Sequence, residues 1–542
     1  MKKTDYALDK KTSRFIITNY NSAPVFSSFF PGIAGTHGIP MWAFYVNRAQ
    51  AIASFGIENK DHPILEFSPA NKAYSITPIN GFRTFIKICQ GSNFQYYEPF
   101  SELSAQSSYK ISSIMSISPY DLTITEENSS LGIKVEICYF TIPEEPFAGL
   151  ARKLSITNTS KKSKRLEIID GLPAVMPYGA NQWCIKNMSR TLEAWMQVDN
   201  LENNVAVYRL SVDPADVSET IEIDKAHFYL SFHYKNSGLE LLKPIVEPDS
   251  VFGQIKSLSF PQAFVKKRNY DFPETQAARS KTPSAMVFLP TGLRGGQTKA
   301  IYSTAGYSSD LSAINRYADK ISKPDFFTSK LRANKRIIEN ITNDIYTKSA
   351  VPEFDYYCRQ TYLDNTLRGG YPLILNNDKL NPLVYYAYSR KHGDLERDYN
   401  NFILSPEYFS NGDGNYRDTN QNRRNNVWFN PSIGQSDIDT FINLIQLDGY
   451  NPLVIKGTRL VITKKSSIKR LLRLIKNKVQ KKQMESALSG PFSPADIIDC
   501  LKKNKVSLTV TKEAFLNRVF SCSSSHNYAS HTEGFWIDHW FY

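Results

Sequence analysis

Hydrophobic and polar positions alternate with a period of two through much of the first part of the chain. The alternation is clearest in six segments: 14–19, 84–89, 133–142, 151–157, 165–170 and 227–234. This period, with Asn, Asp, Gly and Ser between the segments, is typical of antiparallel strands. The polar stretch 158–163 between two of them predicts a β-hairpin. Many short strands without intervening helices predict an antiparallel β-sandwich over residues 1–308.

The pattern changes to a helical period near residue 310. Residues 311–342 are rich in helix formers, and Pro324 divides them into two predicted helices, which we interpret as a helical linker over 309–350. Helices predominate over residues 351–542. The first of them places six side chains on one stripe, namely Phe354, Tyr357, Cys358, Thr361, Tyr362 and Asn365. Further helices are predicted over 383–404, 437–447, 467–484 and 496–502.

Composition fits a globular protein of several domains, and the charge is concentrated in one segment. The 542 residues carry a net charge of +13. Eleven Lys and Arg residues and no Asp or Glu lie between Lys456 and Met484, which leaves +2 for the rest of the chain. The predicted helix 467–484 is therefore a solvated amphipathic helix or a contact for an anionic surface or nucleic acid. Because aromatic residues are missing between Lys456 and Met484, we favour the solvated helix and expect no nucleic-acid partner.

Sorting and metal-binding signals are weak. No run of about 18 apolar residues occurs, so no transmembrane helix and no membrane partner are expected. The N-terminal residues lack the apolar region of a signal peptide, and the six cysteines are scattered without a CxxC pair. We therefore expect free thiols, no metal site and a cytoplasmic protein.

Three segments could carry chemistry. Residues 411–428 combine Gly, Asp, Arg, Asn and Trp in a predicted loop, which is either a solvated surface loop or a sugar site. The segment 533–542 holds Glu533, Asp538 and five aromatic residues. It supplies an acid/base pair or begins an aromatic-rich helix. The glycine-rich stretch 29–42 favours a sharp loop over a phosphate cradle, because no strand–GxxxxGK–helix context surrounds it.

Residues 82–85, 146–160 and 414–422 together resemble the inverting disaccharide and glucan phosphorylases, which include the cellobiose, chitobiose and β-1,3-glucan phosphorylases. Residues 414–424 and 533–540 are most similar to the β-1,3-glucan branch. The resemblance implies a β-supersandwich, a helical linker and an (α/α)6 barrel. Because 192 residues follow position 350, and about 455–525 looks like a basic helical insertion, we expect an incomplete barrel and hence a fragment.

The resemblance also implies a reaction and a set of binding residues. A hexosyltransferase of this type would convert a β-linked gluco-oligosaccharide and inorganic phosphate into α-glucose 1-phosphate, without metal or organic cofactor. Arg417 and Asp418 would grip sugar hydroxyls. The other substrate-binding candidates that the resemblance places are Asn422, Arg423, Asp538 and Trp540. Asn422 stands where cellobiose-type enzymes have a second carboxylate, which moves the expected substrate toward β-1,3-glucans.

Catalysis by this chain alone is not expected. The general acid of the family lies further toward the C-terminus than residue 542, and its Asp-Trp-Asn-Asp-like motif does not occur here. The resemblance implies a homodimer or a complementing C-terminal chain as partner. Two alternatives remain open: a carbohydrate-binding remnant without catalysis, and an inverting glycoside hydrolase that uses Glu533 and Asp538 as its pair.

Overall fold

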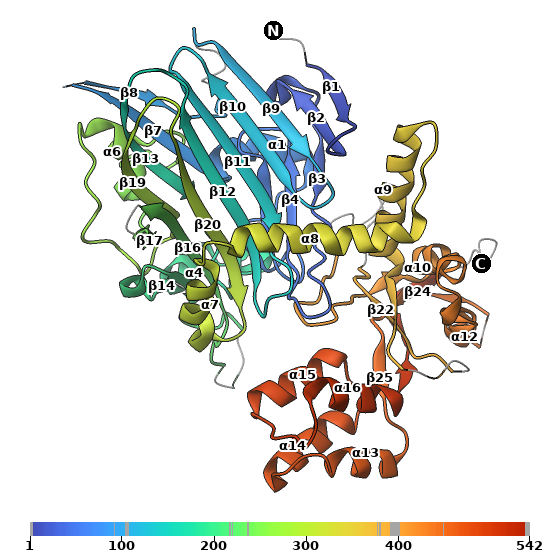
Figure 1. The fold of residues 1–542 in the computed structure, drawn as a ribbon. Coiled ribbons are helices and arrows are strands. Elements are labelled where there is room, and N and C mark those ends of the chain that lie inside the picture. The colour runs from blue at the N-terminus through green and yellow to red at the C-terminus, as the bar shows by residue number, and fades with distance from the viewer. Residues whose placement is uncertain are drawn as a thin grey trace. The chain divides into compact units, whose positions relative to one another are not determined.

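The computed structural model describes residues 4–91, 93–102, 108–215, 218, 221–235, 238–376, 378, 381–390, 402–447 and 449–536, with the backbone alone at 189 and 530–536. The chain divides into two units, shown with their elements in Figure 1. Unit 1 holds residues 1–32 and 41–336, and unit 2 holds residues 33–40 and 337–542. The expected combination of β-structure and helices is confirmed.

The largest sheet lies in unit 1 and is antiparallel throughout (Figure 1). Its strands follow the order β1-β2-β9-β10-β11-β12-β20-β16-β15-β14, and β17 adds to β16. The bounds are β1 Tyr6–Asp9, β2 Arg14–Thr18, β9 Ile111–Ile117, β10 Leu122–Asn128, β11 Ile133–Thr141, β12 Ala148–Asn158, β20 Thr298–Ser308, β16 Ala226–Lys235, β15 Ala206–Leu210, β14 Met196–Asp199 and β17 Gly238–Leu241. Strands therefore form at the predicted segments 14–19, 133–142, 151–157 and 227–234.

A second antiparallel sheet has the order β18-β19-β13-β7-β8 and packs against the first. Its bounds are β18 Pro244–Ile245, β19 Ala285–Leu293, β13 Lys164–Leu172, β7 Arg83–Gln90 and β8 Asn93–Tyr97. Arg152 on β12 bridges the sheets, because its guanidinium forms a buried ion pair with Asp170 on β13 at 2.5 Å. Thr84 on β7 donates to the same carboxylate at 2.7 Å. Pairing and hydrogen bonding of this kind offset the cost of burying both charges between two sheets.

The predicted hairpin at residues 158–163 is wrong. β12 pairs with β11 and β20, whereas β13 pairs with β19 and β7, so the turn joins strands of different sheets. Asn158 stabilises this arch, because its side-chain amide donates to the carbonyl of Lys162 at 2.8 Å and to that of Leu293 at 3.0 Å. A polar turn between two alternating segments fits both connections, so the sequence pattern alone does not distinguish them.

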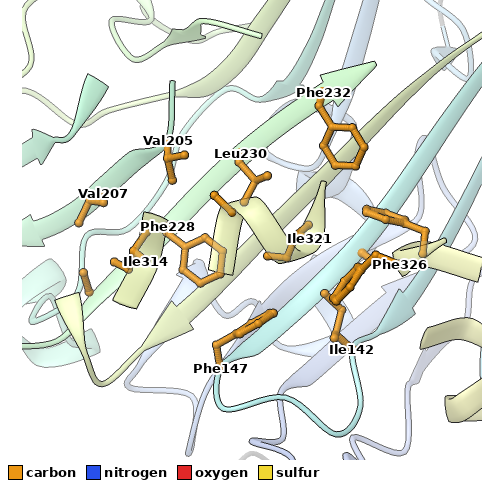
Figure 2. Close-up of a cluster of buried hydrophobic side chains, with 14 of the residues drawn as sticks. Ile142, Phe147, Val205, Val207, Phe228, Leu230, Phe232, Ile314, Ile321 and Phe326 are labelled. Atoms are coloured by element: carbon orange, nitrogen blue, oxygen red, sulfur yellow. The ribbon is translucent and has the colours of Figure 1, made fainter. Parts of the chain in front are cut away.

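The outer face of the large sheet is covered by the helix α7 (Ile314–Ile321) and the start of α8 (Phe326–Thr342). The two helices form on either side of Pro324, as predicted. Figure 2 shows Ile314 and Ile321 of α7 directed toward Phe147, Phe228 and neighbouring sheet residues. Ile314, Ile321, Phe147 and Phe228 are all at most 2% exposed. Their burial is the main contribution of α7 to the stability of unit 1.

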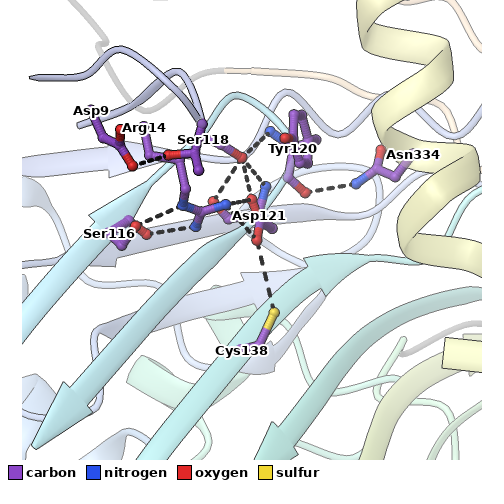
Figure 3. Close-up of polar contacts among 9 residues, drawn as sticks. Asp9, Arg14, Ser116, Ser118, Tyr120, Asp121, Cys138 and Asn334 are labelled. Atoms are coloured by element: carbon purple, nitrogen blue, oxygen red, sulfur yellow. Dashed lines mark hydrogen bonds and ion pairs between the residues drawn. The ribbon is translucent and has the colours of Figure 1, made fainter. Parts of the chain in front are cut away.

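A polar cluster connects several strands of the same sheet with α8 (Figure 3). The Arg14 guanidinium donates to both carboxylate oxygens of Asp121, at 2.7 and 3.0 Å. Cys138 lies 3.9 Å from that carboxylate, and burial raises the pKa of its thiol to about 12. Asn334 of α8 donates to the carbonyl of Tyr120 at 2.9 Å. The cluster ties strands and helix together and leaves Cys138 unreactive.

A four-stranded antiparallel sheet completes the strands of unit 1. Its order is β3-β4-β5-β6, with bounds Ser27–Phe29, Trp42–Val46, Ile52–Gly56 and Pro63–Leu65. The helix α1 (Ala70–Asn80) packs on it through Ala73, which contacts Val46 and Ala53. The strand β4 begins directly after residues 33–40, the segment that belongs to unit 2.

Unit 2 mixes helices with short strands. Its helices include α9 Pro352–Gly369, α10 Tyr416–Arg423, α11 Asn426–Phe429 and α12 Ser436–Asn443. The strands β21 (Tyr371–Ile374) and β22 (Val384–Ala387) form an antiparallel pair. β24 (Asn451–Ile455) lies between β23 (Gly414–Asn415) and β27 (Ala529–Trp536) in a second sheet. Among the described residues, no helix is both long and apolar enough to span a bilayer.

The long helix predicted over 383–404 is wrong where the structure describes it. Residues Val384–Ala387 form β22 instead, with Tyr385 and Tyr386 both buried. Adjacent buried positions on a strand covered on both faces resemble a helical apolar run, which explains the error. Residues 391–401 of that segment lie outside the described residues.

The basic segment forms two helices where one was predicted. α13 (Lys465–Leu472) and α14 (Lys478–Leu488) are separated at Asn477, whose side chain caps α14 by accepting from the backbone amides of Val479 and Gln480. α15 (Pro494–Lys503) forms at the helix predicted over 496–502, and its N-cap residue Ser493 forms a capping box with Asp496. α16 (Lys512–Ser521) and a small sheet of β25 (Arg459–Val461) and β26 (Ser524–His526) complete this part.

Candidate functional site

The segment that carries the resemblance folds as a helix. Residues Tyr416–Arg423 form α10, whereas the sequence predicted a loop over 411–428. Tyr416, Thr419 and Arg423 follow helical spacing and are all at most 5% exposed. The inward face therefore consists of an aromatic, a hydroxyl and a guanidinium side chain. Because none of these is aliphatic, the hydrophobic periodicity that reveals most helices is missing here.

Arg423 lies under α10 and connects it to neighbouring elements. Its Nε donates to the carbonyl of Gly369 at the end of α9, at 2.6 Å. Its guanidinium stacks over the ring of Tyr386 at 3.7 Å from the ring centroid. The Tyr386 hydroxyl donates to Asp437 of α12 at 2.6 Å. The structure thus places this candidate residue in a buried polar network that links α9, α10, α12 and β22.

Burial shifts the acidity of the charged groups in this network. It lowers the pKa of Arg423 from its ordinary value. It also raises the pKa of Asp437, against the opposing attraction of Arg423. Because the pKa of Asp437 is raised, the desolvation of its carboxyl group outweighs the attraction of the Arg423 guanidinium.

Arg417 and Asp418 lie on the outer side of α10. Their side chains are 35% and 25% exposed, and Nε of Arg417 lies 3.6 Å from the carboxylate of Asp418. The side-chain amide of Asn415 donates to that carboxylate at 3.2 Å. A carboxylate in the first turn is favourable at the positive end of the helix dipole. Both residues are therefore accessible to a ligand at the surface of unit 2.

A pocket of about 190 Å³ lies among α9, α10, α11 and the 3-10 helix at 343–345. Aromatic rings and side-chain amides dominate its lining, with Tyr357, Tyr362, Asn365, Asn422, Asn425, Asn426 and Phe429 among the residues. Ile345, Cys358, Thr361 and Thr366 complete the lining, so no Asp, Glu, Lys, Arg or His belongs to it. The volume is below the about 300–1,000 Å³ of sites that enclose drug-sized ligands, so the pocket can enclose about one ring of a ligand.

The lining of the pocket is held in place by contacts within unit 2. Tyr362 donates to Asp344 at 3.2 Å and packs edge-on against Phe429, with ring centroids 5.4 Å apart. The amide of Asn422 donates to the carbonyl of Asp418 at 2.6 Å. Tyr357 is 67% exposed and lies at the accessible side of the lining, whereas Asn426 is 8% exposed. The pocket therefore offers a rigid base and an accessible ring.

The candidates from the sequence are only partly brought together. Asn422 lines the pocket, Arg423 lies in the buried network, and Arg417 and Asp418 belong to the outer side of α10. Asp538 and Trp540 lie outside the described residues. The backbone of Glu533 is part of β27.

Sequence reasoning did not bring together the two segments that line the pocket, although each of them carried a signal. The stripe predicted on α9 contains Tyr357, Tyr362 and Asn365, and these residues do line the pocket. A helix stripe of tyrosines, amides and hydroxyls without Leu, Ile or Val is better suited to a polar ligand than to a core. Asn422, Asn425 and Asn426 lie in the segment 411–428, which the sequence predicted as a surface loop or a sugar site. Phe429 lies just beyond this segment and carried no signal, because a helix as short as α11 has no period to recognise.

Another carboxyl group with a raised pKa lies elsewhere in unit 2. Glu407 accepts a hydrogen bond from the hydroxyl of Ser493, the N-cap residue of α15, at 3.3 Å. Burial raises the pKa of Glu407 to about 7, with Asp496 adding repulsion and Arg459 opposing it. Among the described residues, no group of three or more His, Cys, Asp or Glu side chains could hold a metal ion.

Comparison with known proteins gives likenesses to solved structures alone. No protein-family model matches the chain, and no curated protein matches it. A protein from the human microbiome that is assigned as a kojibiose phosphorylase aligns with 65% of this chain and 32% of its own length, at 9% identity and a TM-score of 0.20. An α-galactosidase of glycoside hydrolase family 36 from Geobacillus stearothermophilus aligns with 56% of this chain and 41% of its own length, at 10% identity and a TM-score of 0.22.

Proposed function

We propose that this chain binds a neutral β-linked gluco-oligosaccharide and supplies the saccharide-binding part of a β-glucoside phosphorylase. The observation that carries the proposal is the lining of the pocket among α9, α10 and α11. Amide and hydroxyl side chains both donate and accept, as vicinal sugar hydroxyls require, and the tyrosine and phenylalanine rings suit the apolar face of a pyranose. The described lining contains no Asp, Glu, Lys, Arg or His, which favours an uncharged ligand.

The resemblance to the inverting phosphorylases supports the reaction class. In that chemistry phosphate attacks the anomeric carbon, and the protein needs only one acid to protonate the leaving oxygen. Among the residues that the structure describes, no carboxyl group lines the pocket. We therefore expect the chain to bind a saccharide without turning it over, with Arg417 and Asp418 as further contacts for the sugar hydroxyls.

Calorimetric titration with laminari- and cello-oligosaccharides tests this proposal. The unaltered chain is expected to bind at least one series, with laminari-oligosaccharides preferred. Asn365→Ala and Asn425→Ala each remove a polar group from the lining and should weaken binding about tenfold, the effect of a hydrogen bond of about 1.4 kcal/mol. Asn443→Ala on the exposed side of α12 removes the same group outside the pocket and should leave affinity unchanged.

Two results would contradict the proposal. The first is the absence of binding to every β-glucoside tried. The second is equal affinity in the two pocket variants and the Asn443→Ala control. Release of α-glucose 1-phosphate from laminaribiose and phosphate by this chain alone would overturn the expectation of binding without turnover, while leaving the saccharide site intact.

A further inference from the structure

The helices α13 and α14 carry a dense group of exposed cations. Six of them are Lys464, Lys465, Lys469, Arg473, Lys478 and Lys482, which we call the cationic face. None of the six forms an ion pair with a carboxylate in the part of the chain that the structure describes. By contrast, the two cations at the start of the basic segment are paired: Lys456 with Asp413 at 2.7 Å and Arg459 with Asp496 at 3.0 Å.

The spacing of these cations is regular along the helices. Lys465, Lys469 and Arg473 follow one another at intervals of four residues, which separates them by about 6 Å along the helix axis. Lys478 and Lys482 repeat this interval on α14. Ionised side chains at this spacing repel one another in the absence of a counter-charge. The arrangement therefore favours an extended anionic partner over a single small anion.

The apolar side of the same helices is already occupied. Ile468, Leu471 and Leu472 of α13 and Met484 and Leu488 of α14 are all at most 8% exposed. α14 packs against α15 and α13 packs against α16, so these side chains form the interior of the four-helix group visible in Figure 1. A helix whose apolar stripe is buried in its own domain cannot insert that stripe into a bilayer. The packing thus argues against a membrane surface as the partner.

Aromatic stacking is also missing from this surface. The segment 456–484 contains no Phe, Tyr or Trp, and Val479 is its one large hydrophobic side chain that is clearly exposed. Single-stranded nucleic acids are bound through aromatic platforms, whereas a duplex keeps its bases stacked and offers its phosphates directly. The lack of aromatic residues, which led us to expect no nucleic-acid partner, therefore excludes only the single-stranded class.

We propose that α13 and α14 bind the phosphodiester backbone of double-stranded nucleic acid through the cationic face. Contacts of Lys and Arg with phosphates position a protein on a duplex without reading its base sequence. The proposed binding is therefore independent of sequence and driven by counterion release. It is separate from the saccharide pocket, which uses α9, α10 and α11, and each proposal can fail without the other.

Fluorescence anisotropy with a labelled 20-base-pair DNA duplex tests this inference on the full chain. If the six cations each neutralise one phosphate, log K against log salt should have a slope of about −5, and affinity should fall about 10³-fold between 50 and 200 mM salt. Replacing Lys465, Lys469, Arg473 and Lys482 together by Gln should reduce the slope by about 3 to 4. These side chains are exposed, so the melting temperature of the variant should be unchanged.

A matched control distinguishes the effect of the cationic face on duplex binding from the effect of net charge. Lys72, Lys110, Lys161 and Lys162 are exposed lysines of unit 1, and replacing all four by Gln removes the same charge. This control should retain the slope and affinity of the unaltered chain. Three results would overturn the proposal: no duplex binding at 50 mM salt, an equal loss in both fourfold variants, or tighter binding to polyglutamate, single-stranded DNA or phosphatidylserine vesicles than to the duplex.

Discussion

The two arginines of α10, Arg417 and Arg423, differ in their surroundings, and this difference predicts effects of substitution that differ in size. Arg423 is buried, donates to the Gly369 carbonyl and stacks on Tyr386. Arg423→Ala should lower the free energy of unfolding by about 2–4 kcal/mol, because the carbonyl and the Tyr386–Asp437 pair lose their buried partner. Arg417→Ala at the surface should change it by no more than about 0.5 kcal/mol. Urea denaturation measures both values, and a larger loss for Arg417→Ala would contradict the assignment.

The raised pKa of Glu407 predicts that the free energy of unfolding decreases as the pH rises. Its pKa is about 7 in the folded chain, against an ordinary value of 4.5. Between these values the folded state holds a proton that the unfolded state has released, so stability falls as the pH rises from about 4.5 to 7. Glu407→Gln should remove this component and raise the melting temperature at pH 8 more than at pH 4.5. An equal shift at both pH values would show that Glu407 is not protonated in the folded chain.

The candidate residues illustrate what a sequence can predict at this scale. Asn422 was identified from a motif and does line the pocket. Tyr357 and Phe429 come from helices that lie 57 residues or more apart in sequence, and the tertiary structure alone places both in the lining of one pocket. Side chains joined by tertiary contacts leave no local periodic signal, so this part of the site could not be read from the chain alone.

At the scale of elements, the junction of α9 and β21 depends on one glycine. Gly370 has φ of 90°, and a Cβ there would lie 2.8 Å from Cβ of Tyr386. Gly434 also has a positive φ, of 58°, but its surroundings are open. Gly434→Ala should therefore cost about 1–2 kcal/mol for the backbone alone. Gly370→Ala should cost about 1–3 kcal/mol more, because Tyr386 must also move. Equal losses in chemical denaturation would refute the steric contribution.

Elements with a strong local signal were predicted correctly, and those set by tertiary context were not. β11 and α7 follow from clear alternation and from helix formers ended by Pro324. β22 was mistaken for helix because its residues are buried on both faces. The division between α13 and α14 was missed, although Asn477 is a good N-cap residue, because the apolar stripe continues through Ile475. A continuous stripe hides a break when both helices pack on the same core.

At the scale of the whole molecule, one short segment from the N-terminal part of the sequence packs within unit 2. Residues 33–40 belong to unit 2, where the backbone amide of Phe409 donates to the carbonyl of Thr36 at 2.7 Å. His37 packs edge-on against Phe409, with ring centroids 5.3 Å apart. The sequence predicted a sharp loop here, but nothing local to 33–40 indicates a partner some 370 residues later. Pairings of this kind arise from the tertiary structure alone.

The division into two units predicts that the chain unfolds in two separable steps, since each unit has its own buried core. Phe228→Ala removes a ring from the core between α7 and the large sheet, which should cost unit 1 about 3–5 kcal/mol. Leu471→Ala removes a side chain from the core of the basic helices and should cost unit 2 about 2–5 kcal/mol. In differential scanning calorimetry each variant should lower the temperature of one transition and leave the other in place. If both variants shifted the same single transition, the two units would unfold as one cooperative body, and the division would describe packing without describing stability.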